Sequence, residues 1–244
     1  MHVYGEHLGR WQLGGELLEL MKTLAAVGGS ASARSAIDRG VATLRYASGD
    51  GHALDVLSAE DRVRALASAS SALAGRGDVA RAIASFREAL RRGEADLSTA
   101  SPAVRALAAA GNNLAVALES KNDRSADETG AMVEAARAAL ISWKLAGTWL
   151  EEERAEYRLA RSLLQAGEPA AALECAGRCL QVCVQHDAPA FERFFAHAVL
   201  AFAHRAAGQA AASRTHRQEA VGQLERIAAN ERQFCQSDLE ELGR

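Results

Sequence analysis

The sequence has few of the residues that interrupt helices or build strands. Its 244 residues include only three prolines, and aromatic residues make up 5%. Alternating runs of β-branched residues and Asn-Gly hairpin turns are missing, so strands have almost no support. Much of the 49% hydrophobic share is alanine, which has the highest helix propensity and lets helices approach closely. The composition therefore predicts an all-α protein.

Several functional classes lack their usual features in this sequence. The net charge is −3 and no basic block occurs, which predicts no nucleic-acid partner. No apolar run approaches the roughly 18 residues that a membrane-spanning helix needs. The first seven residues lack the basic head and apolar stretch of a signal peptide. Only three of the 28 basic residues are lysine, a bias typical of GC-rich bacterial genomes. We expect a cytoplasmic, bacterial protein without a membrane partner.

Pairs of amphipathic helices joined by tight turns recur along the chain. In the stretch 151–183, a leucine stripe ends at Gly167, and Pro169 opens a second apolar stripe. The same layout recurs at 65–90, 112–140 and 194–221. The equivalent turn positions Gly77, Asn122, Gly167 and Gly208 are 45, 45 and 41 residues apart. Such pairs have apolar surface that only stacking against neighbours can bury.

The residues of two pairs resemble the tetratricopeptide repeat (TPR). The segments GDVARAIASFREALRRG, beginning at Gly77, and YRLARSLLQAGEPAAALECAGRCL, beginning at Tyr157, place small residues where that repeat requires them. The spacing exceeds the usual repeat of about 34 residues, as in the long-repeat bacterial branch. The resemblance implies a right-handed α-solenoid of about five antiparallel helix pairs with a C-terminal capping helix. We expect one domain over 1–244, with divergent N-terminal helices at 1–61, repeats at 62–228 and the capping helix at 229–244.

The periodicity predicts eleven helices. Their ranges are 6–27, 30–47, 58–75, 78–92, 102–121, 127–147, 149–166, 169–186, 189–207, 209–228 and 230–242.

Three cysteines in one predicted helix form the strongest candidate for chemistry. Cys175 and Cys183 are eight residues apart, about 12 Å along a helix axis. Zinc–thiolate bonds of about 2.3 Å cannot be made by both residues to one ion. We therefore interpret Cys175, Cys179 and Cys183 as packing residues and predict no metal or other cofactor. His197 and His204 share a helix face and are likewise expected to pack, here against nearby phenylalanines.

No catalytic motif occurs in the chain. Phosphate loops, zinc-protease motifs and nucleophile elbows are all missing, so we do not expect an enzyme. The run Glu151–Glu153 lies at a predicted helix start, where carboxylates complement the helix dipole.

The concave groove implied by the resemblance is the candidate binding site. In repeats of this kind the first helix of each pair lines the groove. The candidate residues there are Asn112, Asn113, Arg154, Arg158 and Arg161. Asparagine can bond to a peptide backbone and guanidinium groups to a carboxylate, so an acidic or C-terminal peptide feature is favoured.

These observations predict a scaffold that binds a protein or peptide. Three alternatives stay open: a regulatory or ligand-sensing module with effector helices in 1–61, a homo-oligomeric structural protein, for instance a homodimer, and a metal-dependent enzyme. The first depends on whether 1–61 stacks onto the repeats.

Overall fold

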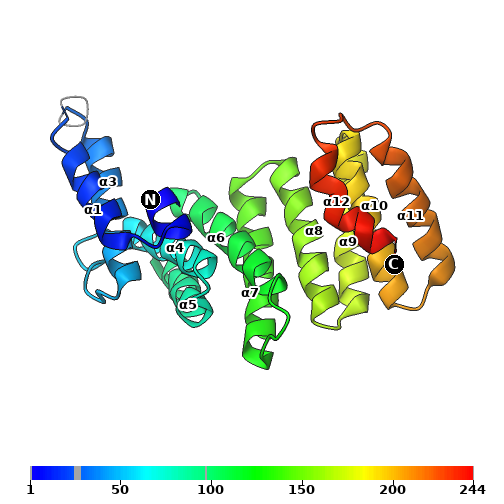
Figure 1. Cartoon of the computed structure of the whole chain (residues 1–244), viewed down its shortest axis with the longest axis horizontal. Helices are drawn as coiled ribbons and strands as arrows, with labels where there is room; N and C mark the ends of the chain where they lie inside the picture. The colour runs from blue at the N-terminus through cyan, green and yellow to red at the C-terminus, as the bar shows by residue number, and fades with distance from the viewer. Residues whose placement is uncertain (1, 25–28, 97, 244) are drawn as a thin grey trace. The chain divides into compact units, whose positions relative to one another are not determined.

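The computed structural model describes residues 2–24, 29–96 and 98–243. Every regular element in these ranges is a helix, which confirms the predicted all-α class (Figure 1). The chain divides into two compact units, unit 1 (Met1–Lys121) and unit 2 (Asn122–Arg244). The predicted helix pair at 112–140 spans the boundary between them, so its packing stays a prediction.

The described residues of unit 1 form one π-helix and five α-helices. They are η1 (His2–His7), α1 (Trp11–Met21), α3 (Ala31–Ser48), α4 (Ala59–Gly75), α5 (Val79–Asp96) and α6 (Pro102–Glu119). Helix α1 packs against α3, α3 against α4, and α4 against both α5 and α6. The N-terminal helices therefore stack onto the repeats of unit 1.

The prediction of one helix over 6–27 is wrong. The structure has η1, a break at Gly9 and Arg10, and then α1, which ends at Met21. Gly9 has φ +62°, a left-handed conformation that stops a helix. The end of the predicted range, 25–28, lies outside the described residues.

Small side chains fill the contacts of α4 with its neighbours. Ala65, Ala67 and Ala69 are essentially inaccessible to solvent, and Phe86 of α5 is 1% exposed. Two buried serines add hydrogen bonds between the helices of this pair. Ser70 Oγ donates to Ala82 O, and Ser85 Oγ donates to Leu66 O, both at 2.9 Å. Because each hydroxyl donates a hydrogen bond to a backbone carbonyl, both serines are buried without leaving an unpaired hydroxyl.

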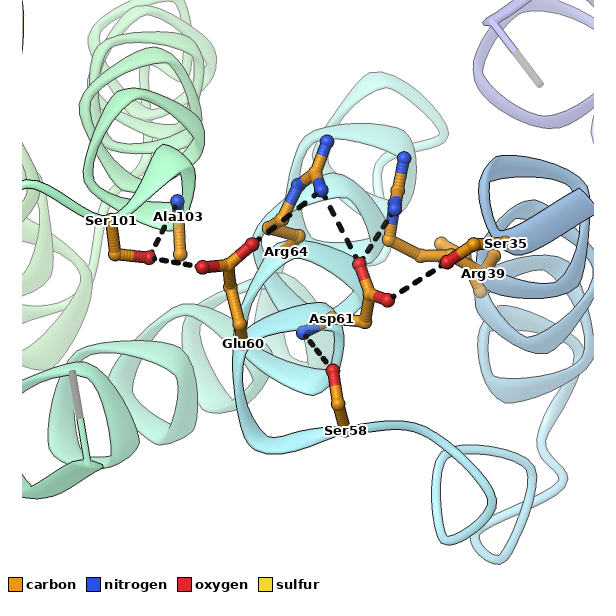
Figure 2. A network of polar contacts seen from close by, with 9 residues as sticks. Ser35, Arg39, Ser58, Glu60, Asp61, Arg64, Ser101 and Ala103 are labelled. Atoms are coloured by element: carbon orange, nitrogen blue, oxygen red, sulfur yellow. Dashed lines mark hydrogen bonds and ion pairs between the residues drawn. The ribbon is translucent and has the colours of Figure 1, made fainter. Parts of the chain in front are cut away.

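A polar network joins three helices of unit 1 near the start of α4 (Figure 2). Asp61 pairs with Arg39 of α3 at 2.6 Å and with Arg64 of its own helix at 3.3 Å. Glu60 accepts a hydrogen bond from Ser101, the N-cap of α6, at 2.9 Å. The network fixes the starts of α4 and α6 relative to α3.

Unit 2, which the structure describes over residues 122–243, has six α-helices and one short 3₁₀ helix. They are α7 (Ala126–Ala146), α8 (Trp149–Gln165), α9 (Pro169–Gln185), α10 (Ala190–Ala206), α11 (Ala210–Leu224), η2 (Arg232–Cys235) and α12 (Gln236–Leu242). Consecutive helices from α7 to α11 pack against each other, and α10 also contacts α8 and α12.

Three hairpins, one in unit 1 and two in unit 2, turn in the same way. Gly77, Gly167 and Gly208 have φ of +77°, +77° and +74°. At each, the following N–H bonds back to the carbonyl five residues earlier, for example Glu168 N to Leu163 O at 2.9 Å. This is the Schellman ending of a helix, which favours glycine because the conformation is left-handed. The three predicted glycine turns are confirmed.

The C-terminal residues form a shorter helix than the predicted 230–242. Residues 232–235 are 3₁₀ and only 236–242 are α-helical. Cys235 and Leu242 are buried in a cluster with Phe194 and Phe202 of α10. Residues 235–242 therefore cover the face of α10 that carries Phe194 and Phe202.

Candidate functional site

The two predicted groove asparagines lie on α6 in unit 1. Asn113 is exposed, and its amide donates to Ser71 Oγ of α4 at 3.3 Å. Asn112 is half-buried beside it. The groove-lining role of Asn112 and Asn113 stays a prediction.

A hollow of about 230 Å³ lies beside Asn113 in unit 1. Its wall comes from η1, α4 and α6 and includes Glu6, Ala67, Ser71, Ala106, Ala109 and Asn113. Apart from Glu6 and Asn113, these side chains are alanine or serine. Small side chains allow the backbone of a bound segment to approach the helices closely, and the amide of Asn113 can both donate and accept hydrogen bonds.

The three predicted groove arginines lie on α8 in unit 2. Arg154 makes a two-point contact with Glu192 of α10, at 2.6 Å to Oε1 and 3.3 Å to Oε2. The Glu192 side chain is 5% exposed, whereas that of Arg154 is 56% exposed. This fork-shaped pairing is the geometry in which guanidinium binds carboxylate most specifically.

Arg161 holds the C-terminal helix. Its guanidinium pairs with Asp238 at 3.1 Å and with Glu241 at 2.9 Å, both on α12. It also lies 5.0 Å from the ring centre of Phe202. Tyr157 of α8 adds a 2.6 Å hydrogen bond to Asp238. The carboxylate-binding chemistry predicted for this face is thus used within unit 2, on the chain's own acidic helix.

Arg158 lies between these two arginines on α8. It is half-buried, and its guanidinium carbon is 5.7 Å from the ring centre of Tyr157. The asparagines belong to unit 1 and the arginines to unit 2. A joint clamp of Asn112, Asn113 and the arginines therefore stays a prediction.

Two buried glutamates of α8 were not predicted. Glu153 is 1% exposed, and its Oε1 accepts a hydrogen bond from the Cys179 thiol at 3.1 Å. Burial, together with the nearby charge of Glu192, raises the pKa of Glu153 to about 8, against the lowering effect of the Cys179 hydrogen bond. With a pKa of about 8, Glu153 carries a proton near neutral pH.

Glu156 is fully buried but has charged partners. Its Oε1 accepts from Lys144 Nζ of α7 and from Arg178 Nε of α9, both at 3.0 Å. One carboxylate therefore joins α7, α8 and α9. The signal for its burial is the spacing of Glu156, Ala160 and Leu163, which lie on one helix face. The dipole role predicted for the glutamate run holds for Glu151, which forms a capping box with Thr148.

The cysteines of α9 are buried, as expected for packing residues. Cys175, Cys179 and Cys183 are at most 3% exposed. Burial raises the pKa of Cys175 to about 11, and hydrogen bonding with Cys183 together with burial raises that of Cys179 well above its usual value. The thiols of Cys175 and Cys179 are therefore poor nucleophiles at neutral pH.

Comparison with known proteins identifies the fold. Neither a protein-family model nor a curated protein sequence matches the chain. Among solved structures, the nearly identical TPR-like repeats of a Podosopora anserina protein, described as a kinesin light chain, are similar with a TM-score of 0.57. That similarity has 16% identity and covers 89% of this chain and 96% of the other. BtubC (BKLC) from P. vanneervenii is similar with a TM-score of 0.58, at 14% identity over 88% of each chain.

The chain has a TPR-like repeat fold. The predicted resemblance and the solenoid fold class are thereby confirmed. At this identity the comparison concerns the fold alone. No helix among the described residues has the length and apolar character needed to span a membrane.

Proposed function

We propose that the protein is a non-enzymatic scaffold that binds a protein or peptide partner on the first helices of its repeats. The TPR-like fold supports this, because stacked helix pairs present extended binding surfaces. The single observation that carries the proposal is the small-residue hollow between α4 and α6, with the Asn113 amide at its edge. An extended peptide segment suits this hollow because its backbone can approach alanine and serine closely.

The arginines of α8 are proposed to bind a different part of the partner from the hollow beside Asn113. Arg161 holds α12, so its charge is engaged within the unit. Arg154 is paired with Glu192 but keeps most of its side chain in solvent. Arg154 and Arg158 are therefore the cationic positions that we propose for an acidic feature of the partner, with Asn112 and Asn113 as the backbone-binding positions.

Filling the hollow tests the proposal directly. Ala109 is exposed and lines the hollow, so Ala109→Glu blocks it without disturbing the buried core. Ala84→Glu, at an exposed position of α5, is the matched control. Affinity purification from the native host followed by mass spectrometry should recover a partner with the wild type and Ala84→Glu but not with Ala109→Glu. Equal recovery with both variants would contradict binding at the hollow.

To test the arginines of α8, Arg154 has to be substituted together with its partner Glu192. Arg154→Ala alone leaves the buried Glu192 without its guanidinium, so a loss of binding would not separate stability from recognition. Arg154→Ala combined with Glu192→Gln and Arg158→Ala removes the charges together. Unchanged partner recovery by this triple variant, with an intact circular dichroism spectrum, would remove the arginines from the proposal.

An apolar patch on α1 favours self-association as a second candidate function. Leu20 is 63% exposed and Leu24 is 53% exposed, and with Tyr4, Leu17 and Met21 they line a hollow of about 500 Å³. Exposed apolar surface of this kind commonly marks a protein interface. Light scattering at two concentrations should show a dimer that Leu20→Glu abolishes. Val56→Glu, at another exposed apolar position of unit 1, should leave it unchanged. A wild-type monomer at both concentrations would contradict this candidate.

A further inference from the structure

Four side chains of α8 and α10 form a cationic surface that contacts the C-terminal helix α12. These side chains, which we call the arginine cradle, are Tyr157, Arg161, Phe202 and Arg205. The guanidinium carbons of Arg161 and Arg205 lie 5.0 Å and 5.4 Å from the centre of the Phe202 ring. The cradle therefore holds two cations close to one buried aromatic ring.

Two carboxylates of α12, one turn apart, occupy the cradle. Asp238 accepts a hydrogen bond from Tyr157 at 2.6 Å and pairs with Arg161 at 3.1 Å. Glu241 pairs with the same Arg161 at 2.9 Å. It also contacts Arg205, through its backbone carbonyl at 3.0 Å and through Oε1 at 3.5 Å. Arg161 thus bridges carboxylates three positions apart on one helix.

Leucines beside these carboxylates add apolar contacts. Leu242 is 4% exposed and lies in one buried cluster with Phe194 and Phe202. Leu239 is partly buried against the same cluster, whereas Glu240 is exposed. The cradle and the adjoining phenylalanines therefore accept the pattern acid–Leu–x–acid–Leu, which residues 238–242 carry.

The docked helix has features that limit its stability. It has seven residues, and no side chain bonds to the backbone at its N-cap. Isolated helices shorter than about 12 residues are marginal in water, so α12 depends on the cradle for its structure. Burial raises the pKa of Asp238, against the lowering effects of Arg161 and Tyr157. Ionised Asp238 therefore leaves water at a net cost, which makes α12 replaceable by a similar helix.

We propose that the arginine cradle binds a short acidic amphipathic helix of a partner protein, and that α12 occupies the site until the partner displaces it. The partner helix carries the pattern acid–Leu–x–acid–Leu. Its leucines supply most of the affinity, and the two guanidinium groups select its carboxylates, because charge complementarity chiefly gives specificity. Both α8 and α10 are first helices of their pairs, where stacked repeats bind partners. The cradle shares no residue with the hollow beside Asn113, so the site is independent of the one proposed above.

Fluorescence anisotropy of a labelled peptide, residues 228–243 in reducing buffer, tests the cradle. In the full chain, Asp238→Lys with Glu241→Lys places two cations against Arg161 and Arg205 and undocks α12. This undocked variant should bind the peptide at least about tenfold more tightly than the wild type. The reason is that the tethered α12 of the wild type competes at an effective concentration on the order of 1 mM. A peptide with the same two lysines should not bind.

A second peptide tests the class of partner. It keeps only the aspartate, the glutamate and the two leucines of the pattern, in an unrelated alanine-rich helix. It should bind the undocked variant within about tenfold of the first peptide, because the cradle contacts only these side chains. Adding Arg161→Ala should remove the binding of both peptides, whereas adding Ala109→Glu, in the hollow beside Asn113, should change nothing. The two sites are thereby tested separately.

Three results would overturn the proposal. The first is that the undocked variant, with its helices retained in circular dichroism, binds neither peptide. The second is that the wild type and the undocked variant bind equally, which would place the peptide elsewhere. The third is that only the first peptide binds, which would restrict the cradle to this chain's own helix, as in an exchange between two copies.

Nuclear magnetic resonance of the wild type tests displacement even if the undocked variant loses its helices. The second peptide, unlabelled and at about 1 mM, is added to the ¹⁵N-labelled full chain. The amide signals of residues 236–242 should move toward positions typical of an unfolded tail, while those of α8 and α10 stay helical. Unchanged signals from residues 236–242 would show that α12 is not displaced and would contradict the proposal.

Discussion

The two units use the same helix pairs but bury different polar groups. Among the described residues of unit 1, every buried polar side chain carries a hydroxyl, as in Ser70 and Ser85. In unit 2, four carboxylates are buried: Glu153, Glu156, Glu192 and Asp238. Unit 1 keeps its main ion network at a partly exposed edge, where Arg39 and Asp61 are 19% and 18% exposed. The buried packing of unit 2 therefore depends on charged groups, whereas the charged groups that join helices of unit 1 lie at this edge.

The difference shows that one fold tolerates two ways of joining neighbouring helices through buried polar groups. Hydroxyls need a single carbonyl partner and cost little to bury once bonded. A buried carboxylate needs a cationic partner or a proton, and removing its cationic partner strongly destabilises the folded protein. Unit 2 supplies these partners from neighbouring helices, through Lys144, Arg154, Arg161 and Arg178.

The largest expected effect is the change that Glu153→Gln makes to the free energy of unfolding at high pH. The folded pKa of Glu153 is raised from 4.5 to about 8, so the folded state holds a proton that the unfolded state has lost between these values. Stability from this group is complete below about pH 4.5 and falls as the pH rises toward 8. Glu153→Gln mimics the protonated side chain, so it should stabilise the protein at pH 9 by on the order of 3 kcal/mol relative to the wild type.

Urea unfolding at pH 5 and pH 9 measures this effect. At pH 5 the variant and the wild type should be nearly equal, since both carry a neutral group. Asp61→Asn in unit 1 is the control for replacing a carboxylate by an amide outside unit 2. A constant effect of Glu153→Gln across this range would mean that Glu153 is ionised in the folded protein.

Arg154→Ala should have the next largest effect. It leaves the buried Glu192 without its two-point partner, and we expect a loss of about 1–3 kcal/mol, reduced from a fully buried pair because Arg154 is largely exposed. Adding Glu192→Gln should recover most of the loss in thermal unfolding. If the double variant is as unstable as the single one, packing of the arginine stem and not the charge is responsible.

The glycine turns should respond alike in both units. Gly77→Ala and Gly167→Ala force a left-handed conformation on alanine, at about 1–2 kcal/mol each. No neighbouring atom meets an added Cβ at either position, so the cost is conformational. Gly177→Ala, inside α9 and equally open, should instead stabilise by about 0.5–1 kcal/mol. Denaturant midpoints of the three variants test this, and a neutral Gly167→Ala would contradict the turn geometry.

The smallest effect belongs to the edge network of unit 1. Arg39→Ala removes a partly exposed pair with Asp61, and we expect a loss of about 0.2–1 kcal/mol. The effect should shrink in 1 M salt because screening weakens such pairs. A loss as large as that of Arg154→Ala would remove the contrast between the two units.

The sequence alone determined the features that depend on a few neighbouring residues. Helical periodicity and the glycine turns at Gly77, Gly167 and Gly208 are local, and the structure confirms them. The resemblance to TPRs was visible because small residues recur at fixed offsets within each pair. The first helix was misplaced because the left-handed conformation of Gly9 does not follow from periodicity.

Only the tertiary structure decided which polar groups meet. Arg154 reaches Glu192 across 38 positions, and Arg161 reaches Asp238 across 77. His197 meets His216 because α11 folds back along α10. Periodicity places a residue on a helix face, but the partner of that face depends on the packing of distant helices. For the same reason, the burial of Glu153 and the engagement of Arg161 by the chain's own C-terminal helix became apparent only in the folded molecule.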